Sequence, residues 1–145
     1  MAAPFGAYHR HVNLGEPLTH AFPEGEVVLA GSHGALDWRV RVFVRDDDLM
    51  TMLDVFDGPT LVACSGFGGT ALPAGSRINY WYGKTDDLPT FAMARTDPTV
   101  SRVTLQTDHG RQIDLKMSDV IPAFALRFAA GALPDQERPV EFLVD

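Results

Sequence analysis

Apolar and polar residues alternate with a period of two along several short segments of the chain. In the segment 38–45, the even-numbered positions are all apolar and face one side of an extended strand, while three arginines face the other. The run Asp46–Asp48 follows, and Asp favours turns over strands. This segment therefore predicts a half-buried antiparallel strand that ends in a turn.

A hairpin signal lies in the second half of the chain. Val100–Thr107 and Arg111–Met117 both alternate, and Asp108–Gly110 between them forms a loop with glycine where a positive φ is expected. The segment 49–56 also fits a helical spacing of apolar residues, but the turn at Asp57–Gly58 favours a strand, with a helix as the alternative. Further short runs predict strands at 27–30, 60–64, 77–82, 90–95, 124–130 and 140–144.

These elements define the fold class. About eight or nine short strands separated by turns, without helical segments between them, predict an all-β fold, an antiparallel β-sandwich of Ig-like or jelly-roll-like type. Residues 1–25 differ, because proline, glycine and histidine interrupt them repeatedly. We expect 1–25 to be an irregular arm with one short strand about Tyr8–Val12, and 26–145 to be a single β-sandwich domain.

The amino-acid composition and charge exclude several classes of protein. A chain of 145 residues that is 46% hydrophobic suits one packed domain and excludes wholesale disorder. Its net charge of −7 argues against nucleic acid as a partner, because phosphate binding needs clustered Lys and Arg. The single cysteine excludes a disulfide framework and a Cys-rich zinc site.

The same composition bears on location. No apolar run approaches the roughly 18–20 residues of a membrane-spanning helix, so no transmembrane segment is expected in this chain. The segment Met1–Phe5 lacks a basic region followed by an apolar stretch, so no secretory signal is visible. We expect a cytoplasmic location if the chain is complete, and an extracytoplasmic one if it is a fragment of a tethered protein.

Several residues together carry a resemblance to a known family. They are Trp38, the segment Cys64–Gly69, the segment Thr96–Val103, Asp108 and Gly110 of the hairpin, Phe128, Leu133-Pro134 and Asp145. In this order they resemble a small β-sandwich domain that recurs in uncharacterised actinobacterial proteins, many of them secreted or membrane-tethered. The resemblance covers roughly residues 26–145. It implies the fold and no catalytic group.

One constellation suggests a metal. His9 and His11 project from the same face of a strand, and Glu16 completes a His-x-His-x4-Glu spacing that resembles the first motif of cupins, which are metal-binding β-barrels. The segment Pro73–Gly75 keeps the Pro-x-Gly of the second cupin motif, but Ile78 stands where that motif has histidine. The competing interpretation is a solvated, His-rich arm.

Two further features concern ligands and nucleophiles. Tyr80 and Tyr82 share one face of a strand and form a candidate ligand-binding pair, for a sugar or a peptide, with Trp81 inside the core. Cys64 ends an apolar run, so we interpret it as a core residue and not as a nucleophile. The segment Gly66–Ala71 matches Gly-x-Gly-x-x-Ala, but no helix can follow it, so it predicts a loop between strands.

These observations favour a non-enzymatic binding or protein-interaction module. Its expected partner is another protein or a second copy of the chain, recognised by loops or by an edge strand, and no cofactor is expected. The alternative is a cupin-like metal-binding protein that uses His9, His11 and Glu16.

Overall fold

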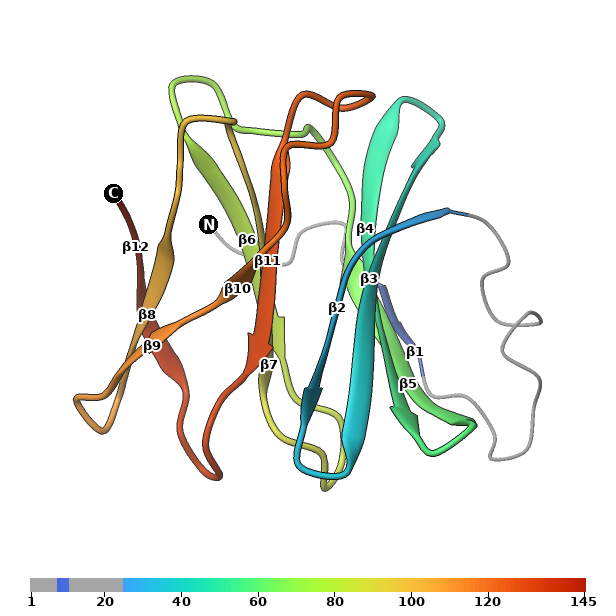
Figure 1. Cartoon of the computed structure of the whole chain (residues 1–145), viewed down its shortest axis with the longest axis vertical. Coiled ribbons are helices and arrows are strands. Elements are labelled where there is room, and N and C mark those ends of the chain that lie inside the picture. The colour runs from blue at the N-terminus through green and yellow to red at the C-terminus, as the bar shows by residue number, and fades with distance from the viewer. Residues whose placement is uncertain (1–7, 11–24) are drawn as a thin grey trace. The chain divides into compact units, whose positions relative to one another are not determined.

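The computed structural model describes residues 8–10 and 25–145, and every regular element among them is a β-strand (Figure 1). The all-β class is therefore confirmed, and no helix in this part of the chain is a candidate for crossing a membrane. The strands are β1 (Tyr8–Arg10), β2 (Glu26–His33), β3 (Leu36–Arg45), β4 (Asp48–Asp57), β5 (Thr60–Phe67), β6 (Ile78–Gly83), β7 (Phe91–Thr96), β8 (Val103–Thr107), β9 (Gln112–Asp114), β10 (Lys116–Met117), β11 (Arg127–Ala132) and β12 (Pro139–Val144).

The chain divides into two compact units, residues 1–71 and 72–145, which are described separately. The arm expected at 1–25 lies outside the described residues except for β1 and Gly25, and β1 falls within the segment Tyr8–Val12 where a short strand is expected. A single domain over 26–145 stays a prediction.

The first unit is one five-stranded antiparallel sheet in the order β1-β5-β4-β3-β2. Tight turns join the consecutive strands from β2 to β5. In the turn between β3 and β4, Asp46 and Asp47 both have positive φ, as the two central residues of a type I′ hairpin turn do. The turn expected at Asp46–Asp48 is confirmed there. The segment 49–56 is the strand β4, so the helical alternative is wrong.

Strand β5 continues beyond the end that the sequence predicts. The glycine-rich segment from Gly66 is expected to be a loop, but Gly66 and Phe67 are still paired with Met52 and Thr51 of β4. Glycine is required at position 66, because the carbonyl oxygen of Thr51 in the neighbouring strand β4 occupies the space that a Cβ atom there would need. Glycine therefore serves here as a point of close strand approach.

Both faces of this sheet carry buried side chains. One carries Trp38, Val40 and Leu53, all at most 4% exposed. The other carries a cluster of Met50, Met52, Leu61 and Cys64, with Phe43 and Phe56 packed against it. The arginine face of 38–45 is consequently not a solvated face, because Arg41 is only 3% exposed.

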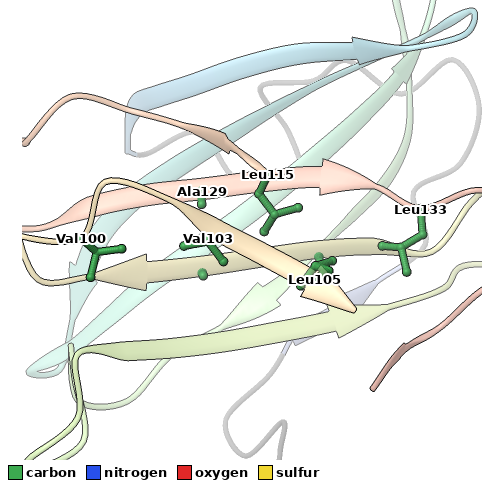
Figure 2. Close-up of a cluster of buried hydrophobic side chains, with 8 residues drawn as sticks. Val100, Val103, Leu105, Leu115, Ala129 and Leu133 are labelled. Atoms are coloured by element: carbon green, nitrogen blue, oxygen red, sulfur yellow. The ribbon is translucent and has the colours of Figure 1, made fainter. Parts of the chain in front are cut away.

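The second unit contains two antiparallel sheets, in the orders β10-β11-β7-β6 and β12-β8-β9. One hydrophobic cluster takes side chains from both, among them Val103 and Leu105 of β8 and Ala129 of β11 (Figure 2). The hairpin expected about Asp108–Gly110 is confirmed, with Gly110 at φ 78°.

Other bounds in the second unit differ from the expected ones. The segment 111–117 splits at Leu115, so β9 pairs with β8 in one sheet and β10 with β11 in the other. The structure describes twelve strands, more than the eight or nine expected. Strand β11 begins at Arg127 rather than at 124, since Ala125 has a positive φ within a turn.

Candidate functional site

Two exposed tyrosines lie on β6, at the edge of one sheet of the second unit. Strands β6 and β12 are edge strands of their sheets. Tyr80 and Tyr82 of β6 pair with Ala94 and Ala92 of β7, which belong to the core, so both rings lie on the face that meets the other sheet. They are 44% and 46% exposed, whereas Trp81 on the opposite face is 6% exposed. The expected orientation of these three rings is confirmed.

Phe142 of β12 holds the tyrosines in place from the other sheet. Its ring stacks on Tyr80, with centroids 4.0 Å apart and planes at 17°. Its centroid lies 6.5 Å from that of Tyr82, with planes at 30°. We call Tyr80, Tyr82 and Phe142 the aromatic seam. Stacking of this kind fixes ring orientations and adds a favourable contact beyond burial.

A pocket of about 240 Å³ opens beside Tyr82, at one end of the aromatic seam. It lies between the chain that follows β6 and the chain that precedes β12. Its walls combine a tyrosine ring with donors and acceptors of several kinds. The lining residues are Tyr82, Gly83, Lys84, Thr90, Gln136, Glu137 and Arg138.

Glu137 is the fixed acceptor of this pocket. Its two carboxylate oxygens accept hydrogen bonds from Thr107 Oγ1 at 2.7 Å and from Arg111 Nε at 2.9 Å. The hydrogen bond from Thr107 and the pairing with Arg111 lower the pKa of Glu137 below its usual range. The carboxylate is therefore charged at neutral pH and held in one position.

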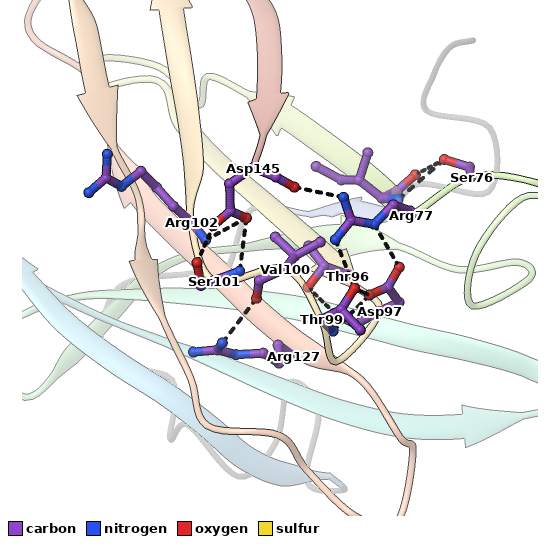
Figure 3. A network of polar contacts seen from close by, with 11 residues as sticks. Ser76, Arg77, Thr96, Asp97, Thr99, Val100, Ser101, Arg102, Arg127 and Asp145 are labelled. Carbon is purple, nitrogen blue, oxygen red and sulfur yellow. Dashed lines mark hydrogen bonds and ion pairs between the residues drawn. The ribbon is translucent and has the colours of Figure 1, made fainter.

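A polar network holds the strands together at the far end of the aromatic seam (Figure 3). Arg77, just before β6, donates to the carbonyl oxygen of Asp145 at 2.6 Å and pairs with Asp97 at 3.1 Å. The Asp145 carboxylate accepts hydrogen bonds from the hydroxyl of Ser101, from its backbone N–H at 2.9 Å and from that of Arg102 at 3.3 Å. These bonds lower the pKa of Asp145 to about 2. The network fixes the end of β12 against the loop that precedes β8.

The metal constellation lies largely outside the described residues. His9 is in β1, opposite Ser65 of β5, and the structure describes only its backbone. His11 and Glu16 lie outside the described residues. Among the residues that the structure does describe, no three His, Cys, Asp or Glu side chains are grouped so that they could hold a metal ion. A site at His9, His11 and Glu16 stays a prediction.

A buried charged cluster in the first unit has no counterpart in the sequence analysis. Asp54 of β4 is fully buried, and its Oδ2 lies 2.6 Å from Arg41 Nε and 2.8 Å from Arg39 Nε, both of β3. Burial alone raises the pKa of Asp54, but the hydrogen bonds and charges of the arginines outweigh it and lower the pKa overall. The pairing of Arg39 with Asp54 in the register of β3 and β4 is the feature that would have predicted this cluster. That register can be assigned only once the hairpin of β3 and β4 is known.

Cys64 borders this charged cluster. Its Sγ lies 3.8 Å from an Arg41 guanidinium nitrogen, and its side chain is fully buried. Burial, together with the charge of Asp54, raises the pKa of the Cys64 thiol well above its usual range. The thiol is therefore protonated at neutral pH and is a poor nucleophile. The prediction that Cys64 is a core residue is confirmed.

No protein-family model, curated protein or solved structure matches this chain.

Proposed function

We propose that this chain is a non-enzymatic binding module that recognises its partner with the aromatic seam and the adjoining pocket. In this proposal residues 26–145 form a single β-sandwich domain, as the resemblance to actinobacterial domains implies, and the edge strands β6 and β12 carry the binding surface. A rigid scaffold that presents a site at its edge is a common arrangement for binding.

The observation that carries the proposal is the fixed exposure of Tyr80 and Tyr82. Each ring leaves nearly half of its surface open, although Phe142 stacks on Tyr80 and lies beside Tyr82. A tyrosine offers a large contact area and has few side-chain rotations to lose on binding. Rings that are already held in place lose still less conformational freedom, so ligand binding costs less entropy.

The ionisable groups about the site support binding rather than catalysis. Glu137 and Asp145 are both engaged by protein donors, and both have lowered pKa values. A general acid needs the opposite shift, towards neutral pH. Lys84 Nζ donates hydrogen bonds to the carbonyl oxygens of Asp86 at 2.7 Å and Leu88 at 2.8 Å, so its side chain is held against this loop.

An edge strand is also a surface on which a second chain can pair by backbone hydrogen bonds. The alternative partner is therefore another protein or a second copy of this chain. That association would involve β6 or β12, since both are edge strands. It would extend a sheet instead of filling the pocket beside Tyr82.

The proposal is tested without knowledge of the ligand. Small organic molecules gather at binding sites, so phenol and isopropanol are titrated into the isotope-labelled full chain while backbone amide shifts are followed by NMR. We expect saturable shifts at 80–84 and 136–142. Tyr82→Ala should abolish them, and Val44→Ala, which trims an exposed apolar side chain of β3, should not. Saturable shifts confined to other parts of the chain would overturn the proposal.

A further inference from the structure

The groups that line the pocket indicate which class of ligand fits it. We propose that the aromatic seam and its pocket bind a neutral saccharide chain. This inference rests on the proposed binding function and adds the chemistry of the ligand to it.

The spacing of the tyrosines suits a chain of sugar rings. A pyranose ring has an apolar face of C–H groups that packs on an aromatic ring. Tyr80 and Tyr82 are two residues apart on one strand, which separates their backbone positions by about 6.6–6.8 Å. Both rings are open to solvent. The two rings are therefore placed to contact successive sugar units rather than a single one.

The few polar groups in the mainly apolar lining of the pocket suit hydroxyl groups. A sugar hydroxyl both donates and accepts hydrogen bonds, so it needs acceptors and donors in the same site. Glu137 offers a carboxylate, Lys84 and Arg138 offer charged donors, and Thr90 and Gln136 offer groups that do both. A purely apolar ligand would cover these groups without satisfying them, and that carries a free-energy cost.

The charges about the pocket favour a neutral ligand. The charge of Glu137 is opposed by Arg111 at 2.9 Å, and Arg138 lies 3.7 Å from Asp108. Two exposed acidic residues, Asp86 and Asp87, follow Lys84 in the loop after β6. The whole chain carries a net charge of −7. A polyanion therefore meets no net positive field here, and a polycation meets Lys84 and Arg138 at the pocket itself.

The surface of the second unit is less suited to a protein partner. A stable protein interface buries about 800 Å² on each side and is anchored by large apolar or aromatic residues. Among the described residues of this unit, the exposed large apolar side chains are Tyr80, Tyr82, Val120 and Val140. The tyrosines thus supply the only aromatic anchors in that set, and they adjoin a pocket whose mainly apolar lining carries a few polar groups.

Calorimetric titration of the full chain with neutral hexasaccharides tests the inference. The probes are the hexamers of β-1,4-linked glucose, of β-1,4-linked mannose and of α-1,4-linked glucose. We expect at least one to bind saturably. Removal of a stacked ring in Tyr82→Ala should weaken that binding about tenfold, whereas Tyr82→Phe should stay within about twofold of the unchanged chain. Val44→Ala on β3 is the matched control and should bind as the unchanged chain does.

A second variant tests the pocket. Gln136 has φ 64°, so Gln136→Gly removes the amide while its backbone stays unstrained. We expect weaker saccharide binding with unchanged circular dichroism. Binding that neither Tyr82→Ala nor Gln136→Gly alters would overturn the inference, because the saccharide would then occupy another surface.

The failure of this inference is distinguishable from the failure of the proposed function. If none of the three hexamers binds while phenol and isopropanol still shift 80–84 and 136–142, the saccharide class is wrong and the proposed binding site stands. If neither the hexamers nor the organic probes act there, both proposals are wrong.

Discussion

Replacement of the buried carboxylate of Asp54 tests the account of the first unit. Asp54→Asn preserves the shape of the side chain and removes its charge. In the native sheet that carboxylate is fully buried and pairs with Arg41, which is 3% exposed, and with Arg39. The substitution leaves the guanidinium of Arg41 buried without its carboxylate partner.

The expected magnitude follows from that burial. Removal of one partner from a buried ion pair costs about 3–5 kcal/mol, because the other charge stays desolvated. This is a large part of the 5–15 kcal/mol that typically separates folded from unfolded states. For a chain of this size it corresponds to a fall in melting temperature of roughly 10–16 °C. Arg39→Ala is the matched control, since that side chain is 26% exposed, and should cost only about 1 kcal/mol.

Urea unfolding followed by tryptophan fluorescence and circular dichroism measures these differences. The double substitution Arg41→Met with Asp54→Leu removes both charges together, and we expect it to recover most of the stability lost in Asp54→Asn. The pKa of Asp54 is lowered in the folded state, so its contribution is present above its unfolded pKa of about 3.9 and is lost as the pH falls below that value. A loss of less than about 1 kcal/mol for Asp54→Asn at pH 7 would refute the reasoning.

Three further predictions concern other parts of the chain. Gly66→Ala should destabilise the protein by about 1–3 kcal/mol in urea unfolding, because a Cβ atom there meets the Thr51 carbonyl; an unchanged midpoint would contradict the close strand approach. Asp145→Asn should destabilise the protein at pH 7, and the difference from the unchanged chain should vanish as the pH falls from about 4 to about 2, because the folded pKa of about 2 lies below the unfolded value of about 3.9. A pH-independent difference in denaturant midpoint would contradict the role of the ionised carboxylate at Ser101. If the His-x-His-x4-Glu spacing holds a metal, mass spectrometry of protein purified without chelator should find about one equivalent that His11→Ala loses, and a clearly substoichiometric content would remove the cupin-like alternative.

The local alternation of apolar and polar residues, together with the turn residues, predicts much of the fold. The alternation in 38–45 and the turn after it specify β3 and its hairpin, because side chains two apart share a face and Asp tolerates positive φ. The same rule places Tyr80 and Tyr82 together on one face of β6, partly exposed, and Trp81 on the opposite face. These features depend only on neighbours within a few residues.

The features that the sequence does not reveal all depend on contacts between distant segments. Phe142 is 60 or more residues from the tyrosines that it stabilises, and nothing in 140–144 marks it as their partner. The sequence pattern does not mark Asp54 as a buried charge, because its pairing with Arg39 follows only from the register of β3 and β4. Gly66 reads as a strand breaker, because the close approach that requires glycine comes from β4. Sheet order and register must be known before any of these can be assigned.

The central claim is that the aromatic seam and its pocket form the binding site of this chain. The most direct measurement is the NMR map of amide shifts produced by phenol and isopropanol, recorded for the unchanged chain, Tyr82→Ala and Val44→Ala. The account predicts saturable shifts at 80–84 and 136–142 that disappear in Tyr82→Ala and persist in Val44→Ala. Shifts that saturate elsewhere, or that persist unchanged in Tyr82→Ala, would contradict it.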